Sequence, residues 1–134
     1  MIVKDRYGYS VEVDTAFEET RERVVATLKE QGFGVLTEID VKATLKQKLD
    51  ADFRKYTILG VCNPPLAYRA LQAEKQIGLL LPCNVIVFEN DDGRSTVAAI
   101  DAEAQLGVVG RPKLAEVARE VSDKLRKALE AVDL

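Results

Sequence analysis

Two nearly continuous apolar runs restrict the folds open to this sequence more than any other feature. Residues 56–62 read Tyr-Thr-Ile-Leu-Gly-Val-Cys, and residues 83–89 begin Cys-Asn-Val-Ile-Val. Such runs are typical of β-strands that are buried on both faces. Cys62 closes the first run before an Asn-Pro pair, and Cys83 opens the second run after a proline. The cysteines therefore stand at strand ends next to turns, where folds often place functional residues.

Periodicity and capping residues predict the other elements. Residues 7–13 alternate with a period of two, as a half-buried strand does. Asn63 followed by proline is a strong helix start, with the asparagine as N-cap. The segment 102–110 has no clear period. Apolar residues spaced at three and four predict the remaining helices. One helix ends before Gly32, one covers 41–49 with Leu45 and Leu49 inward, one begins at Pro64, and the last runs from Pro112 to Val132. Further short apolar runs predict strands at 34–39 and 95–101.

The order of these elements predicts an α+β fold. We expect a two-layer sandwich in which one mixed sheet, with a C-terminal antiparallel hairpin, carries helices mainly on one face. The hairpin turn is the Asn-Asp-Asp-Gly sequence at 90–93. The length predicts a single domain over residues 1–134. Because one helical layer leaves a second apolar sheet face uncovered, we also expect a homodimer.

Composition excludes several classes of function. The chain has no histidine, which removes Ser-His-Asp and Cys-His catalysis within a monomer and the usual ligand sets of structural zinc. A formal net charge of −3 without a basic block argues against nucleic acid or anionic membrane as a partner. No apolar stretch is long enough to span a bilayer, and no secretory signal opens the sequence. We therefore expect a cytoplasmic protein with reduced cysteines.

The two cysteine-bearing turns form the candidate site. We expect Cys62, Asn63, Cys83 and Asn84 to surround a pocket for a small molecule or a soft metal ion, with Cys62 and Cys83 as the metal ligands. A thiol-dependent redox or transfer enzyme is the alternative, because a helix N-terminus after Cys62 would lower the thiol pKa. A structural or interaction module without a pocket is the third possibility, since free cysteine also serves as core packing. The sequence leaves cofactors undefined.

Several motifs resemble one known family. They are Tyr-Thr-Ile-Leu-Gly-Val-Cys-Asn-Pro at 56–64, Ala-Tyr-Arg-Ala-Leu at 67–71, Gly-Leu-Leu-Leu-Pro-Cys-Asn-Val at 78–85 and Ala-Ile-Asp at 99–101. This pattern resembles the bacterial and archaeal family called domain of unknown function 302, over almost the whole chain. The resemblance implies a small, dimeric α+β fold. It implies no activity, because the family has no agreed catalytic residues or ligand.

Overall fold

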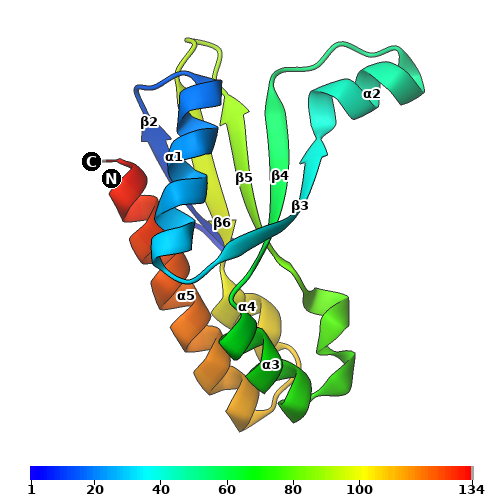
Figure 1. Cartoon of the computed structure of the whole chain (residues 1–134), viewed down its shortest axis with the longest axis vertical. Helices are drawn as coiled ribbons and strands as arrows, with labels where there is room; N and C mark the ends of the chain where they lie inside the picture. The colour runs from blue at the N-terminus through cyan, green and yellow to red at the C-terminus, as the bar shows by residue number, and fades with distance from the viewer. Residues whose placement is uncertain (134) are drawn as a thin grey trace.

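A six-stranded sheet forms the centre of the protein, seen in a computed structural model that describes residues 1–133 (Figure 1). The strands are ordered β1-β2-β6-β5-β4-β3 across the sheet. The two cysteine-bearing strands, β4 and β5, are neighbours and have the bounds that their apolar runs predict. The strands are β1 Val3–Lys4, β2 Gly8–Val13, β3 Gly34–Asp40, β4 Tyr56–Cys62, β5 Cys83–Glu89 and β6 Ser95–Ile100.

The helices cover one face of the sheet and both of its ends. They are α1 Phe17–Glu30, α2 Val41–Leu49, α3 Pro64–Ala73, the 3-10 helix η1 Lys75–Leu80, α4 Ala102–Gly107 and α5 Pro112–Val132. α1 and α5 lie side by side on one face, α2 lies beyond one end, and α3, η1 and α4 lie beyond the other (Figure 1). This arrangement confirms the predicted α+β sandwich. No helix in residues 1–133 combines the length and the apolar character that crossing a membrane requires.

The sheet is antiparallel throughout, so the prediction of a mixed sheet is wrong. The reason lies in the connections from β3 to β4 and from β4 to β5. Both contain helices, which is typical of connections between parallel strands. However, α2 and the α3–η1 pair stay beyond the ends of the sheet (Figure 1). In both connections the chain therefore returns at the end where it left, so β4 pairs antiparallel with β3 and β5 pairs antiparallel with β4.

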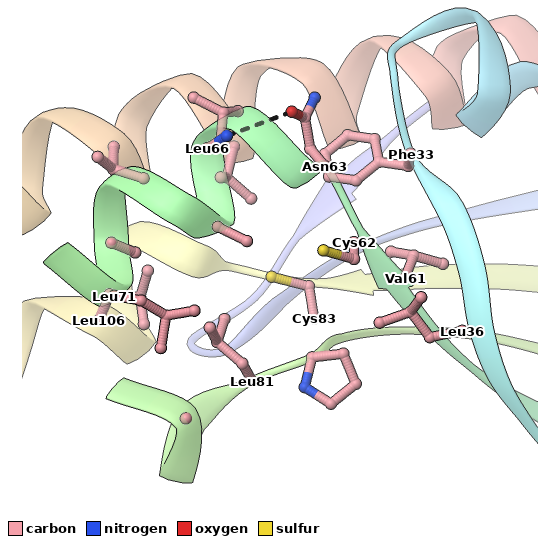
Figure 2. Close-up of a pocket in the computed structure, with 16 residues that line it drawn as sticks. Phe33, Leu36, Val61, Cys62, Asn63, Leu66, Leu71, Leu81, Cys83 and Leu106 are labelled. Carbon is pink, nitrogen blue, oxygen red and sulfur yellow. Dashed lines mark hydrogen bonds between the residues drawn. The ribbon is translucent and has the colours of Figure 1, made fainter. Parts of the chain in front are cut away.

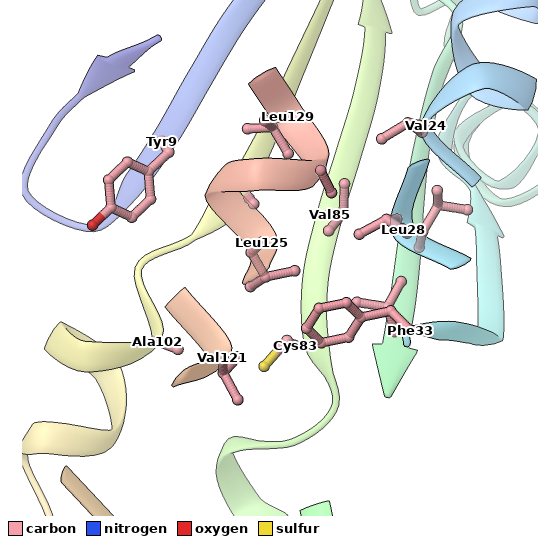
Figure 3. Close-up of a cluster of buried hydrophobic side chains, with 14 of the residues drawn as sticks. Tyr9, Val24, Leu28, Phe33, Cys83, Val85, Ala102, Val121, Leu125 and Leu129 are labelled. Atoms are coloured by element: carbon pink, nitrogen blue, oxygen red, sulfur yellow. The ribbon is translucent and has the colours of Figure 1, made fainter. Parts of the chain in front are cut away.

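The core lies between the sheet and the α1–α5 layer. Figure 3 shows Leu28 of α1, Leu125 and Leu129 of α5 and Val85 of β5 directed into one cluster. All four side chains are fully buried. The apolar stripe of α5 recurs at three and four along its 21 residues, as the sequence predicts. Burying a leucine of this kind stabilises the fold by roughly 1.5–3 kcal/mol, and α5 carries several such side chains.

Within residues 1–133, no helix covers the opposite face of the sheet (Figure 1). Ile39, Ile58, Ile86 and Ala98 stand opposite one another in register on four neighbouring strands, so they form one apolar row. Ile39 is 48% exposed, and the other three side chains are half-buried. Beside this row, the rings of two aromatic residues from β4 and β5 stack at a centroid distance of 5.3 Å. We call this surface, made of the outward-facing residues of β3, β4, β5 and β6, the open face.

Two local elements differ from the sequence-based expectation. α4 occupies part of the segment without a clear period; Asp101 caps it by accepting a hydrogen bond from the Ala104 N–H. α2 has the predicted bounds, and the Asp40 side chain caps it by accepting from the Ala43 N–H, but none of its residues is buried. Leu45 is only half-buried and Leu49 is 70% exposed, so they are not an inward pair. α2 projects past the sheet and has no second layer to pack against (Figure 1).

Gly32 ends α1 and approaches the site described below. Its φ is +86°, a left-handed conformation that glycine adopts without strain. A Cβ added at this position would stand only 2.8 Å from the Asn63 Nδ2 atom. Gly93 provides a comparison, because its φ is +84° but its surroundings are open. Gly32 is therefore required both by its backbone conformation and by the closeness of Asn63.

We predict that Gly32→Ala destabilises the protein more than Gly93→Ala. The left-handed backbone costs an alanine on the order of 1–3 kcal/mol at either position. Only Gly32→Ala adds the collision with Asn63. In an Asn63→Ala background, the extra destabilisation caused by Gly32→Ala should disappear. Urea melts of the wild type, Gly32→Ala, Asn63→Ala and the double variant measure this as a double-mutant cycle. Equal losses for the two glycine variants would contradict the close contact.

Candidate functional site

The two cysteines meet at one end of the sheet. β4 ends at Cys62 and β5 begins at Cys83, whose backbone partner across the ladder is Val61. Figure 2 shows both sulfur atoms directed into the same hollow. Both cysteines are free thiols; Cys62 is half-buried and Cys83 is buried. The structure therefore brings together the two residues that the sequence singles out.

The hollow between them is a cavity of about 320 Å³. The ends of β4 and β5, α3 and η1 surround it (Figure 2). Leu106 of α4 with Val117 and Val121 of α5 contribute deeply buried side chains. Leu36 of β3 and Leu71 of α3 also line it, but they are 65% and 42% exposed. The cavity therefore runs from a buried apolar interior to an apolar opening at the surface.

Asn63 fixes one wall of the cavity. Its Oδ1 atom accepts a hydrogen bond from the Leu66 N–H at 3.4 Å, which confirms the predicted N-cap of α3. Its Nδ2 atom donates to the Gln31 carbonyl oxygen at 3.2 Å. The sequence predicts the first bond but not the second. Together they tie the start of α3 to the C-terminal end of α1.

The N-terminus of α3 has no free donor for an anion. Pro64 and Pro65 lack an N–H, and the Leu66 N–H is bonded to the Asn63 side chain. The next amide, that of Ala67, donates to the Asn63 carbonyl oxygen at 2.9 Å. The helix start therefore caps itself, and it offers a thiolate or a phosphate none of the usual contacts.

Burial controls the chemistry of both thiols. Desolvation raises the pKa of the Cys62 thiol above its ordinary value. Desolvation, and secondarily the nearby Cys62, raises the pKa of the Cys83 thiol to about 11. The sequence suggested the opposite direction for Cys62, from the dipole of α3. With the helix donors absent or occupied, desolvation dominates, and both groups are protonated thiols at neutral pH.

Asn84 does not line this cavity, although the sequence predicted that it would lie there beside the two cysteines. Successive side chains of a strand point to opposite faces, and Cys83 faces the core side. Asn84 is exposed and instead lines a hollow of about 370 Å³ on the open face, with Tyr7 and Ile86. The strand period of two could have given this separation from the sequence alone. Of the four candidate residues, Cys62, Asn63 and Cys83 share one site.

A protein-only metal centre has too few ligands here. Within residues 1–133, no group of three or more histidine, cysteine or carboxylate side chains is placed to hold a metal ion. Cys62 and Cys83 are the two candidate ligands, and both would have to lose a proton from a desolvated thiol. The arrangement suits the packing of an uncharged group against the thiols better than ion coordination.

Comparison with known proteins identifies the family. The family model described as domain of unknown function DUF302 matches residues 9–132. The chain belongs to the DUF302 family. A crystal structure of an uncharacterized conserved DUF302 protein from Bacillus stearothermophilus is similar, with 34% sequence identity and a TM-score of 0.86. The match covers 92% of this chain and 96% of that one. A search of curated proteins found no match.

For this DUF302 protein, sequence reasoning missed most of the cavity wall. The sequence predicts a helix at 112–132 that contains Val117 and Val121, but nothing in its pattern marks them as cavity residues. Sequence reasoning attached no role to Phe33, Leu36 or Leu106, all of which line the cavity. An apolar pattern shows which side chains avoid water, whereas an unfilled volume depends on how distant elements meet. The two cysteines and Asn63 were the only local signals for this site.

We predict that both thiols of this DUF302 protein alkylate slowly at neutral pH. In Cys62→Ala, the remaining Cys83 should react with iodoacetamide at pH 8 at least about tenfold more slowly than in the urea-unfolded chain, because desolvation still raises its pKa after the contribution of Cys62 is removed. In Cys83→Ala, the rate at Cys62 should rise steadily with pH through pH 9. Intact-mass time courses measure both rates. A rate plateau below pH 8 would identify a thiolate and contradict the prediction.

Proposed function

We propose that this protein is a binding domain for a small molecule, held in the cavity beside Cys62 and Cys83. The observation that carries the proposal is the cavity of about 320 Å³, which is open to the surface between α3, η1 and the sheet end. Ligand pockets are concave, mostly apolar and usually preformed, with volumes of about 300–1,000 Å³. This site has those properties, and they favour binding over a structural module without a pocket.

The properties of the thiols favour binding over thiol catalysis. A nucleophilic cysteine needs a lowered pKa or an adjacent base. Burial raises the pKa of both Cys62 and Cys83, and no charged side chain lines the cavity among the described residues. A soft metal ion is the weaker ligand class, because it would rest on two desolvated thiols. Unpaired cysteines fit a reducing compartment, so we place the protein in the cytoplasm.

We also propose that the protein works as a homodimer joined through the open face. The apolar row of Ile39, Ile58, Ile86 and Ala98 crosses four strands without helical cover. The stacked rings of Tyr56 and Phe88 extend it. A contiguous apolar surface of this kind is typical of an interface, and a two-fold axis lets one such surface cover its own copy.

A fragment screen with a cavity-filling variant tests the binding function. Ala67 lines the cavity from α3, whereas Ala115 is exposed on α5. Ala67→Phe should fill the cavity, and Ala115→Phe makes the same change elsewhere. We expect some fragments from a library of charged, polar and apolar compounds to shift the backbone amide resonances of Cys62 and Leu66. These shifts should persist in Ala115→Phe and be lost in Ala67→Phe. A library without any such fragment would refute the binding function.

The homodimer predicts a different response to a charge on the open face. Ile86→Glu should convert the dimer to a monomer, because a buried interface would have to desolvate a carboxylate. Val108→Glu is the matched control, since Val108 is 79% exposed at the end of α4 and away from the open face. Light scattering at micromolar concentration should give a dimer mass for the wild type and for Val108→Glu. A monomer mass for the wild type, or a dimer mass for Ile86→Glu, would contradict this interface.

A further inference from the structure

The cavity lining restricts the ligand to a narrow chemical class. Sixteen residues line the cavity, and none of them is charged. Apart from the two cysteines and Asn63, the side chains are hydrocarbon or, at Gly78, absent. Transfer of an unpaired polar group into such surroundings costs several kcal/mol, and transfer of an isolated charge costs far more. The part of a ligand that enters must therefore be uncharged and largely without polar atoms.

The polar atoms that do reach the cavity are already engaged. The Asn63 side chain uses Oδ1 for the Leu66 N–H and Nδ2 for the Gln31 carbonyl oxygen. The proline residues at the start of α3 remove two further donors. The remaining polar groups are the thiols of Cys62 and Cys83, which are weak hydrogen-bonding groups and pack as small apolar ones. No side chain in the lining offers a polar ligand a strong partner.

The volume sets the size of the group that enters. At about 30 Å³ per water-sized unit, 320 Å³ holds on the order of ten non-hydrogen atoms. The exposed Leu36 and Leu71 continue the apolar surface to the opening. A hydrocarbon can therefore pass from the opening to the interior along apolar side chains, and any polar end of a larger molecule would remain outside in water.

We propose that the ligand inserts an uncharged hydrocarbon body of about ten non-hydrogen atoms, with no polar group inside the cavity. This inference rests on the proposed binding function and specifies its ligand class. Carboxylates, phosphates, sugars and nucleobases do not enter. Selection against them comes from desolvation of the ligand, since the cavity supplies no compensating hydrogen bonds or ion pairs.

Naphthalene and adenine test this inference, because each is a flat bicyclic compound of about ten non-hydrogen atoms, so desolvation cost is the main difference. Naphthalene should shift the amide resonances of Cys62 and Leu66 and should bind at least about a hundredfold more tightly than adenine. Decan-1-ol serves as a linear probe and should bind at the same amides. Ala67→Phe should abolish both interactions, and Ala115→Phe should leave them unchanged.

Protection of Cys62 from alkylation gives a second measurement that does not depend on the cavity-filling variant Ala67→Phe. In Cys83→Ala, saturating naphthalene should slow iodoacetamide alkylation of Cys62 at pH 9 at least tenfold, whereas adenine should not. Binding of polar or charged fragments at the Cys62 and Leu66 amides, without binding of naphthalene or decan-1-ol, would overturn the ligand class and leave the binding function standing. If no compound of either kind binds there, both proposals fail.

Discussion

The site depends on the two hydrogen bonds of one asparagine. Asn63 follows the last residue of β4, caps α3 through the Leu66 N–H and holds the end of α1 through the Gln31 carbonyl oxygen. A polar side chain that is 8% exposed must satisfy its hydrogen bonds, so this position fixes where three elements meet. α3 leaves the sheet in a direction set by that junction. The wall of the cavity follows from the same direction, and the glycine at the end of α1 provides the room that the asparagine needs.

The cavity exists because the core of this protein is built from two parts. α1 and α5 fill the space over the middle of the sheet, where leucine and valine side chains interdigitate (Figure 3). Beyond the end of β4 and β5 the sheet stops, and α5 continues past it towards α3 and α4 (Figure 1). There α3, η1, α4 and α5 pack against one another and against the strand ends, and small residues such as Ala67 and Ala70 stand where larger side chains would close the space. Native interiors leave few voids larger than a water molecule, so an opening of this size fits the proposed binding function.

The sequence predicted what is decided locally. β4 and β5 were found because their apolar runs are continuous, and the N-cap at Asn63 was found because its bond lies within one turn. α4 was missed because six residues are too few to show a helical period. The mixed sheet was a wrong prediction, since a helix between two strands does not reveal whether it crosses the sheet or stays at one end. The apolar character of the cavity, and the raised pKa of Cys83, depend on desolvation by residues distant in sequence, which no local pattern records.

The register shift in β3 has a consequence for how the molecule meets its own copies. β3 is an edge strand that is exposed on both sides, and its pairing with β4 slips between Val35 and Thr37. The intervening Leu36 is turned out of the regular ladder and lines the cavity opening. The same irregularity interrupts the row of backbone groups that another strand would need as a template. The opposite edge, β1, is only two residues long. Both borders of the sheet therefore resist fibre-like growth by strand addition, so the protein can keep a wide apolar surface without polymerising.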